Sequence, residues 1–175
     1  KINTSYKFQG PSTSTYLTLN DGDLGYTAPF TISALFNMSS PGGAYAGIVT
    51  KGRETQHDWI GLWANTTQGF TFGWESGPKG GNTFGSVLSS NTWYYGAGTF
   101  DGTTRRLYLN GWPNGSSTGW YAGITGSPTS IANDRNNSSA ITFNGTIDEV
   151  RISNVARSAD WIKTEYNNQN SPASF

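Results

Sequence analysis

The stretch "TWYYGAGTFDGTTRRLYLNG", residues 92–111, contains two runs of strand-forming residues that are joined by an Asp-Gly pair and closed by an Asn-Gly pair. Both dipeptides are typical of tight turns between antiparallel strands. In the first run, Gly96 and Gly98 alternate in step with Phe100, so one face of that strand carries almost no side chain. The stretch therefore predicts a β-hairpin whose inner face leaves room for bulky neighbours.

A second stretch supplies such neighbours. In "GFTFGWES", residues 69–76, Phe70, Phe72 and Trp74 share one face, and we expect this aromatic row in the core, with Trp74 filling the space over the glycines. Further strands bounded by Gly, Asn, Asp or Pro are predicted at 5–10, 16–20, 30–38, 46–51, 58–65, 140–145 and 147–153. So many strands in one domain require two packed sheets. The sequence predicts an all-β, two-sheet antiparallel sandwich.

The predicted helix content is small. One short C-terminal helix is expected from about Ala159 to Tyr166, with Ser158 as its N-cap. The chain has 175 residues and no break in composition, which indicates a single domain over 1–175. It contains no cysteine, so the fold depends on its core and on any bound ion instead of disulfides.

Charge and composition exclude several classes of partner. Eleven basic and eleven acidic residues are scattered along the chain, so nucleic acid is not an expected partner. No apolar run approaches the length of a membrane span, so membrane insertion is not expected either. The Asn/Thr/Ser/Gly-rich surface favours a secreted protein, outside a bacterial or archaeal cell or on its surface. Since the chain opens at Lys1, we expect an excised domain or a processed chain.

The hairpin at 92–111, followed by "FNGTIDEVRISNVARSADWI" at 143–162, closely resembles the laminin G-like jelly roll of the concanavalin A-like lectin and glucanase superfamily. The segments 6–19 and 30–36 resemble its opening strands, so the resemblance covers almost the whole chain. Two departures stand out. Gln9 stands where the family usually has Asp, and Gly96 and Gly98 stand where it has β-branched residues.

The resemblance implies a structural calcium ion at the sandwich edge. Asp148 matches the family's ligand at the start of the last strand, and backbone carbonyls near Gln9, Gly10 or Gly47 could supply further oxygens. The alternative is that Asp148 caps a turn through backbone amides. The Gln9 departure bears directly on this calcium site.

The acidic residues do not indicate catalysis. Asp148 and Glu149 are consecutive in a predicted strand, so their carboxylates should leave on opposite faces, whereas glycosidase acids converge on one bond at roughly 5 to 10 Å. Glu149 is expected to form a solvated pair with Arg151. A single histidine and the absence of cysteine leave triad and zinc chemistry without support. We therefore expect a non-catalytic protein.

Tryptophan is the remaining signal, with seven residues. In "DWIGLWAN", residues 58–65, Ile60 and Leu62 should face the core, which leaves Trp59 and Trp63 on the opposite, concave surface. Indole rings beside polar side chains are typical of sugar-binding surfaces. By contrast, Trp93 is expected in the core, and Trp161 is expected to pack the predicted helix onto the rest of the fold.

Other candidate ligand contacts complete the expected site. They are the loop residues His57 and Asp58, the neighbours Tyr95, Arg106 and Tyr108 on the same surface, and the loop residues Trp112, Trp120, Tyr121, Asp134 and Arg135.

Three functions remain open. The first is a carbohydrate-binding module or lectin that contacts a polysaccharide or glycan through exposed aromatics and polar loops, as part of a larger extracellular protein. The second is a laminin G-like adhesion module that binds another protein domain. A glucanase-type hydrolase is the least favoured, because the sequence lacks a close pair of acids.

Overall fold

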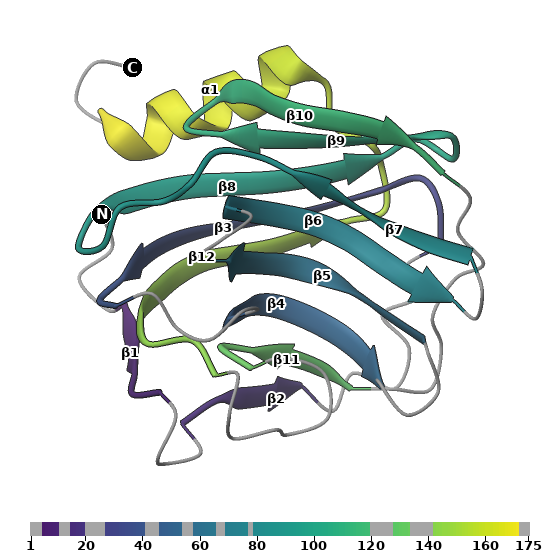
Figure 1. Cartoon of the computed structure of the whole chain (residues 1–175). Helices are drawn as coiled ribbons and strands as arrows, with labels where there is room; N and C mark the ends of the chain where they lie inside the picture. The colour runs from purple at the N-terminus through teal and green to yellow at the C-terminus, as the bar shows by residue number, and fades with distance from the viewer. Residues whose placement is uncertain are drawn as a thin grey trace.

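A computed structural model of the chain describes residues 5–10, 15–19, 27–40, 46–53, 58–65, 69–76, 79–119, 128–133 and 142–171. These residues form two six-stranded sheets that pack face to face, with one helix on the outside of one sheet (Figure 1). Every strand pair is antiparallel apart from one isolated bridge. The predicted jelly-roll sandwich is confirmed. No helix in the described part of the chain has the length and apolar character needed to cross a membrane.

The first sheet contains, in spatial order, β1 (Tyr6–Phe8), β12 (Gly145–Ser153), β3 (Phe30–Met38), β8 (Trp93–Phe100), β9 (Thr104–Leu109) and β10 (Trp112–Thr118). The second contains β2 (Leu17–Leu19), β11 (Thr129–Ile131), β4 (Ala46–Arg53), β5 (Asp58–Asn65), β6 (Gly69–Ser76) and β7 (Lys79–Phe84).

The sequence did not predict β7, β10 or β11, because Gly, Asn and Ser dominate the first two and β11 is very short. The predicted strand at 140–145 is wrong in its described part. Gly145 begins β12, but Thr142 makes only an isolated bridge to Gly47.

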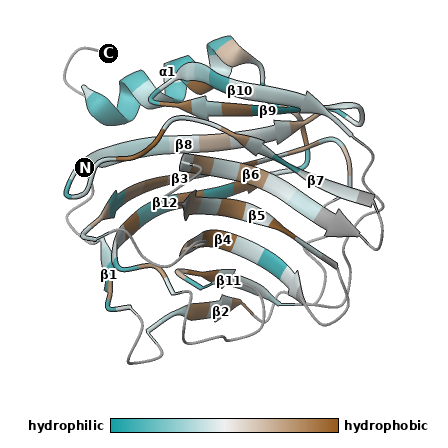
Figure 2. Cartoon of the chain, viewed as in Figure 1, coloured by the Kyte–Doolittle hydropathy of each residue, from teal (hydrophilic) through white to brown (hydrophobic). Residues whose placement is uncertain are grey.

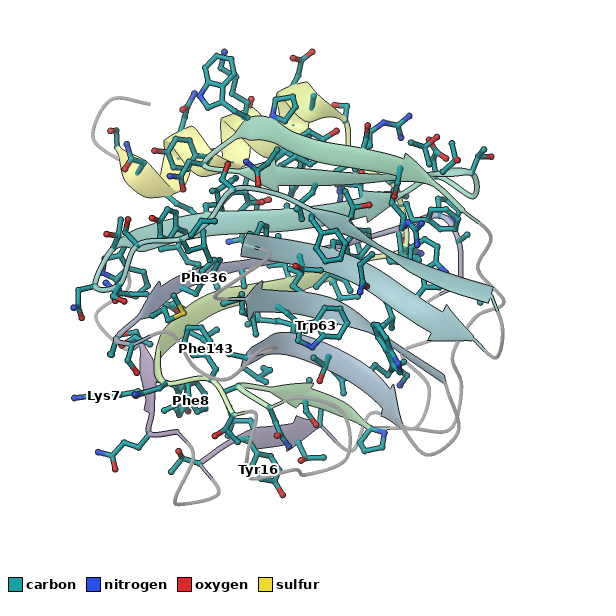
Figure 3. The ribbon with its side chains drawn as sticks, in the orientation of Figure 1. Lys7, Phe8, Tyr16, Phe36, Trp63 and Phe143 are labelled. Carbon is teal, nitrogen blue, oxygen red and sulfur yellow. The ribbon has the colours of Figure 1, made fainter. Side chains whose placement is uncertain are left out.

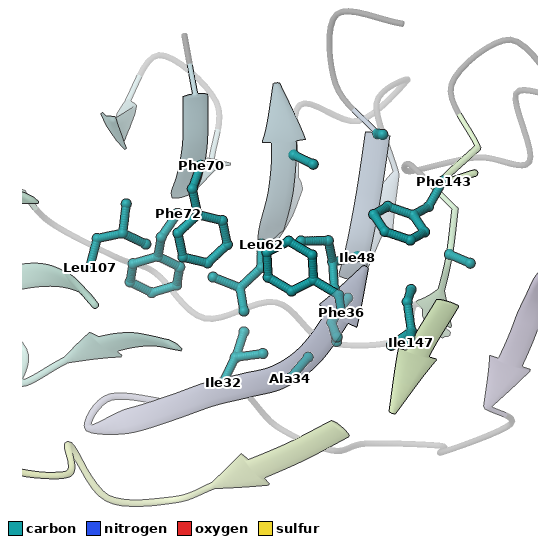
Figure 4. Packing of buried hydrophobic residues seen from close by; sticks show 14 of the residues in the cluster. Ile32, Ala34, Phe36, Ile48, Leu62, Phe70, Phe72, Leu107, Phe143 and Ile147 are labelled. Atoms are coloured by element: carbon teal, nitrogen blue, oxygen red, sulfur yellow. The ribbon is translucent and has the colours of Figure 1, made fainter. Parts of the chain in front are cut away.

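The two sheets share one hydrophobic core, which Figure 4 shows from close by. The expected match between glycines and aromatic rings is present. A Cβ atom at Gly96 would lie 2.4 Å from Phe70, and one at Gly98 would lie 2.5 Å from Phe72. Phe70 and Phe72 therefore fill the space over the glycines, where Trp74 was expected. Trp74 is buried and packs edge-on against a different residue, Phe100, at 4.6 Å between ring centres.

Buried Arg105 joins the sheets along the edge formed by β7 and β10. Its guanidinium donates to the carbonyl oxygens of Gly81 on β7 and Thr118 on β10, and it lies 4.4 Å from the ring centre of Trp74. Thr83 and Ser117 add a hydrogen bond between their hydroxyls at 2.5 Å. Burial lowers the pKa of Arg105. These contacts hold the two edge strands together.

Helix α1 (Ala159–Asn170) starts where the sequence predicted and runs past Tyr166, the predicted end. The Ser158 side chain accepts a hydrogen bond from the Trp161 amide, as an N-cap does. Much of the helix surface is hydrophilic in Figure 2, and Ile162 and Glu165 are its buried residues. Ile162 packs with residues on the outer face of the first sheet, so the helix covers that face.

Candidate functional site

Trp59 and Trp63 lie on the predicted face of β5, opposite Ile60 and Leu62, which belong to the core. Their rings pack edge-to-face with 5.0 Å between centres, and Figure 3 labels Trp63 over β5. However, Trp59 is only 7% exposed and Trp63 only 2%. The prediction that these two indole rings form a solvent-facing platform is therefore wrong. Alternation identifies the face that points away from the core, but tertiary packing decides whether other parts of the chain cover that face.

Tyr95, Arg106 and Tyr108 do not share a surface with these indoles, so that prediction is also wrong. They lie on β8 and β9 of the other sheet and face away from the core. Tyr95 and Tyr108 are buried with Ile162 under helix α1. The error has a simple cause: alternation assigns a residue to a face of its strand, whereas strand order assigns the strand to a sheet.

Arg106 forms an ion pair with Asp101 on the same outer face. It lies 2.5 Å from Asp101, and this hydrogen bond lowers the pKa of the Asp101 carboxyl to about 2. The Asp101 carboxylate also accepts the backbone amides of Thr103 and Thr104 in the turn between β8 and β9. The pair thus stabilises the hairpin turn.

Trp112 is 61% exposed, in agreement with an aromatic that could touch a ligand. It is the first residue of β10 instead of a loop residue, and the Lys163 ammonium of α1 lies 4.3 Å from its ring centre. The other predicted ligand contacts, His57, Trp120, Tyr121, Asp134 and Arg135, lie outside the described residues, and so does the side chain of Asp58.

Three of the four predicted calcium ligands lie near Thr142. Gly47 bridges to Thr142, and a Cβ atom at Gly10 would lie 3.0 Å from the Thr142 carbonyl oxygen. The Gln9 carbonyl already accepts a hydrogen bond of 2.9 Å from the Thr15 hydroxyl. The backbone here is closely packed and partly hydrogen-bonded.

The fourth predicted ligand, Asp148, is placed elsewhere. In β12, Gly145 pairs with Phe8 of β1, and Asp148 lies three residues further along, about 10 Å at 3.3 Å per residue. Its carboxylate accepts the amide of Glu149 at 2.8 Å. Among the described residues, no cluster of three or more acidic or histidine side chains could hold a metal ion. The four predicted residues therefore do not fit one calcium shell, and calcium binding itself stays a prediction.

A cavity of about 790 Å³ lies between helix α1 and the outer face of the first sheet, and we call it the helix–sheet cavity. Its volume is in the range of small-molecule sites. Five aromatic residues line it: Trp93, Tyr94, Tyr95, Trp161 and Tyr166. Residues with amide, hydroxyl and carboxyl groups line the same cavity, so its lining is both aromatic and strongly polar.

A β-bulge brings Asp148 and Glu149 into this lining together. The pairing of β12 with β3 shifts between Asp148 and Arg151, and Glu149 has a φ of 50°. The extra residue cancels the alternation that would send neighbouring side chains to opposite faces. Both carboxyl-bearing residues line the helix–sheet cavity, so their predicted separation on two faces is wrong.

Arg151 joins the strand to the helix through two carboxylates. One guanidinium nitrogen lies 2.6 Å from Glu149, and the other binds Glu165 of α1. The Tyr95 hydroxyl donates to the second oxygen of Glu165 at 2.6 Å. Burial is the main cause of a raised pKa at Tyr95. We call Glu149, Arg151 and Glu165 the Arg151 clamp; it is more than the solvated pair predicted from sequence, because Glu165 is buried.

Among the described residues that line the cavity, Gln169 has a side-chain amide without hydrogen-bond partners. Both its amide nitrogen and its amide oxygen are buried, and neither has a hydrogen-bond partner among the described residues. Each unsatisfied buried polar atom costs about 1–3 kcal/mol, so a native structure normally supplies a partner. Gln169 lines the helix–sheet cavity, and rotation of its side chain would present the amide to a ligand there.

Sequence reasoning missed this site, although two periodic signals were available. Trp161, Glu165 and Gln169 are spaced i, i+4 and i+8, which places them on one face of a helix. Trp93 and Tyr95 alternate on one face of β8. Trp93 is half-buried and lines the cavity, contrary to the expected core position. The sequence did not show that these two faces meet.

The fold that carries this cavity is a two-sheet antiparallel sandwich with one C-terminal helix. The sequence profile described as the concanavalin A-like lectin/glucanases superfamily, a laminin G-like family, matches residues 11–163. The chain belongs to this family. None of the curated proteins matches the chain in sequence.

Solved structures agree with this fold. Domain 4 of AbnA, an extracellular arabinanase from Geobacillus stearothermophilus solved with arabinotriose, is 17% identical with a TM-score of 0.74, covering 94% of this chain and 77% of that one. The CBM40 of a Ruminococcus gnavus sialidase, solved with α2,3-sialyllactose, is 15% identical with a TM-score of 0.72, covering 91% and 95%. Domains LG4-5 of the mouse laminin α1 chain are 17% identical with a TM-score of 0.67, covering 85% and 40%.

Proposed function

We propose that this chain is a non-catalytic carbohydrate-binding module and that the helix–sheet cavity holds the glycan. The observation that carries the proposal is that five aromatic residues line one cavity together with amide and carboxyl groups. A sugar ring offers an apolar face to an aromatic ring and a rim of hydroxyls to polar groups. The similarity to sugar-binding domains of other proteins supports the same proposal.

Each part of the lining has a role in this proposal. Trp93 and Trp161 come from the strand and the helix, so they supply aromatic surface from two sides of the cavity. The Gln169 amide offers one acceptor and two N–H donors, which suits hydroxyl groups because a hydroxyl can both accept and donate. The Arg151 clamp keeps the helix and strand at a fixed separation, which reduces the cost of ordering the site on binding.

The chemistry of the carboxylates supports binding instead of hydrolysis. A glycosidase needs one carboxyl group that carries a proton and a second that attacks or activates water. Glu149 and Glu165 both bind the Arg151 guanidinium, so each is already engaged in an ion pair. Glu165 is further held by the Tyr95 hydroxyl. Neither residue is placed as a free general acid.

A glycan array followed by calorimetry tests the proposal. Gln169→Met keeps the side-chain length and removes the amide, and we expect affinity for the best glycan to fall about tenfold, or 1.4 kcal/mol. Trp93→Ala should weaken binding at least as much. Asn167→Met changes the same kind of group on an exposed residue of α1 that does not line the cavity, and it should leave affinity unchanged.

Two results would contradict the proposal. The first is a wild-type protein that retains no glycan. The second is full affinity in both Gln169→Met and Trp93→Ala. Circular dichroism and thermal unfolding of every variant separate loss of binding from loss of fold.

A protein-adhesion function is the second candidate, because an apolar surface is exposed at the edge formed by β1 and β2. Tyr6, Leu17 and Leu19 are exposed there, and Tyr6 and Leu17 line a smaller cavity of about 210 Å³. Apolar surface of this kind is typical of protein contacts. Capture of a protein partner that is lost on Tyr6→Ser, without any glycan response, would select adhesion.

We also propose an extracellular or cell-surface location within a larger protein. The polar, lysine-poor composition and the extracellular arabinanase among similar structures support it. Detection of the parent protein in the culture medium or on intact cells by antibody labelling tests this location.

A further inference from the structure

The charges around the helix–sheet cavity indicate which class of glycan it accepts. Asp148, Glu149 and Glu165 line the cavity, and Arg151 is the only cationic side chain among its described lining residues. Three carboxylates against one guanidinium give the described lining a net negative charge. A negative cavity repels carboxylate-bearing sugars.

The Arg151 guanidinium already forms ion pairs within the protein. Both terminal nitrogens of Arg151 contact carboxylates, one from Glu149 and one from Glu165. These two carboxylates already offset the charge of the single guanidinium, so an incoming carboxylate would meet a net negative charge. The described lining therefore contains no arginine whose charge is not already balanced by carboxylates.

The remaining polar groups suit uncharged hydroxyls. One oxygen of Asp148 accepts the Glu149 amide, and the other has no partner within the described parts of the chain, so it can accept a hydrogen bond from a hydroxyl. With its side chain turned into the cavity, the Gln169 amide can both donate to a sugar oxygen and accept from a sugar hydroxyl. Aromatic rings cover the apolar parts of the same cavity.

From this arrangement we infer that the helix–sheet cavity selects uncharged, hydroxyl-rich glycan segments and rejects segments that carry a carboxylate. The inference rests on the proposed carbohydrate-binding function and adds the class of ligand. It makes Asp148 a specificity-determining residue, because its charge is free of an ion pair among the described residues.

The test compares each neutral glycan with its sialylated or uronate-bearing counterpart on one array, with affinities then measured by calorimetry at low salt. We expect the wild-type protein to bind the neutral member at least tenfold more tightly. Asp148→Asn keeps the acceptor oxygen for the Glu149 amide, removes the charge and replaces the second oxygen by an N–H donor, so it should raise affinity for the acidic member and narrow the ratio between the two affinities. Asp160→Asn, an equal charge change on an exposed helix residue outside the cavity, should alter neither.

Equal or tighter binding of the acidic glycans by the wild-type protein overturns the inference. So does a discrimination that Asp148→Asn leaves unchanged. If both glycan types bind equally and Gln169→Met abolishes both, the proposed function stands and only the charge selection fails. If no glycan binds, the proposed function fails and the inference fails with it.

Discussion

Replacing Arg151 by Met isolates the contribution of the Arg151 clamp to stability. The Glu165 side chain is only 4% exposed, whereas Glu149 is 21% exposed and Arg151 47%. Removing the arginine leaves the Glu165 carboxylate buried without a cation, and breaking such a pair costs about 3–5 kcal/mol. We expect about 3 kcal/mol, because the Tyr95 hydroxyl still donates to Glu165 and Arg151 itself is partly solvated.

The two carboxylates of the clamp provide the internal comparison. Glu149→Gln removes the more exposed partner and should cost no more than about 1 kcal/mol. For a chain of this length, each kcal/mol shifts Tm by about 2–4 °C, so Arg151→Met should lower Tm by roughly 6–12 °C. Scanning calorimetry and urea unfolding both measure this difference.

A double variant tests whether Arg151→Met loses stability because it leaves the Glu165 carboxylate buried without a cation. Arg151→Met combined with Glu165→Gln removes the cation and the buried charge together, so we expect it to be more stable than Arg151→Met alone. The reasoning is refuted if Arg151→Met costs no more than Glu149→Gln, or if the effects of Arg151→Met and Glu165→Gln simply add.

Three further predictions concern the core, the pH dependence and calcium. Gly98→Ala places a methyl group 2.5 Å from the Phe72 ring, so it should destabilise the fold by about 1–3 kcal/mol in urea unfolding, and Phe72→Leu should recover part of this loss. Burial raises the pKa of Tyr95 above its usual value near 10, so the stability that its neutral hydroxyl contributes is present below pH 10 and decreases as the pH rises further. Tyr95→Phe should therefore show a smaller loss of stability than the wild type between pH 9 and 11. Because the four predicted calcium ligands do not meet, Asp148→Asn should not change any rise in Tm that 1 mM calcium produces over EDTA; loss of that rise would restore Asp148 as a ligand.

The sequence predicted those features of the fold that depend on local periodicity. The alternation of Phe70, Phe72 and Trp74 predicted their place in the core correctly, because the strand is regular and fully buried on that side, although Phe70 and Phe72 lie over the glycines in place of Trp74. The start of α1 was also predicted, because Ser158 caps it through a local hydrogen bond. Such contacts involve residues that are close in sequence or follow a simple repeat.

The site could not be predicted in the same way. The face of Trp59 and Trp63 was correct, but their burial depends on parts of the chain that are distant in sequence. Asp148 and Glu149 share a cavity only because a bulge interrupts β12. The sequence of that strand, "GTIDEVRIS", contains no residue pattern that predicts the positive φ of Glu149. The cavity itself arises where a helix crosses a sheet, which is a property of the assembled fold.

The two edges of the sandwich, β7 with β10 and β1 with β2, differ in the contacts that stabilise them. Along β7 and β10, Arg105 and the Thr83–Ser117 hydroxyl pair tie one sheet to the other, whereas β1 and β2 at the opposite end have only three residues each. Amide protons of β1 and β2 should consequently exchange with solvent long before those of β8, since local opening needs few bonds to break there. Under a pulling force, the described strands should therefore separate first at that short-stranded end.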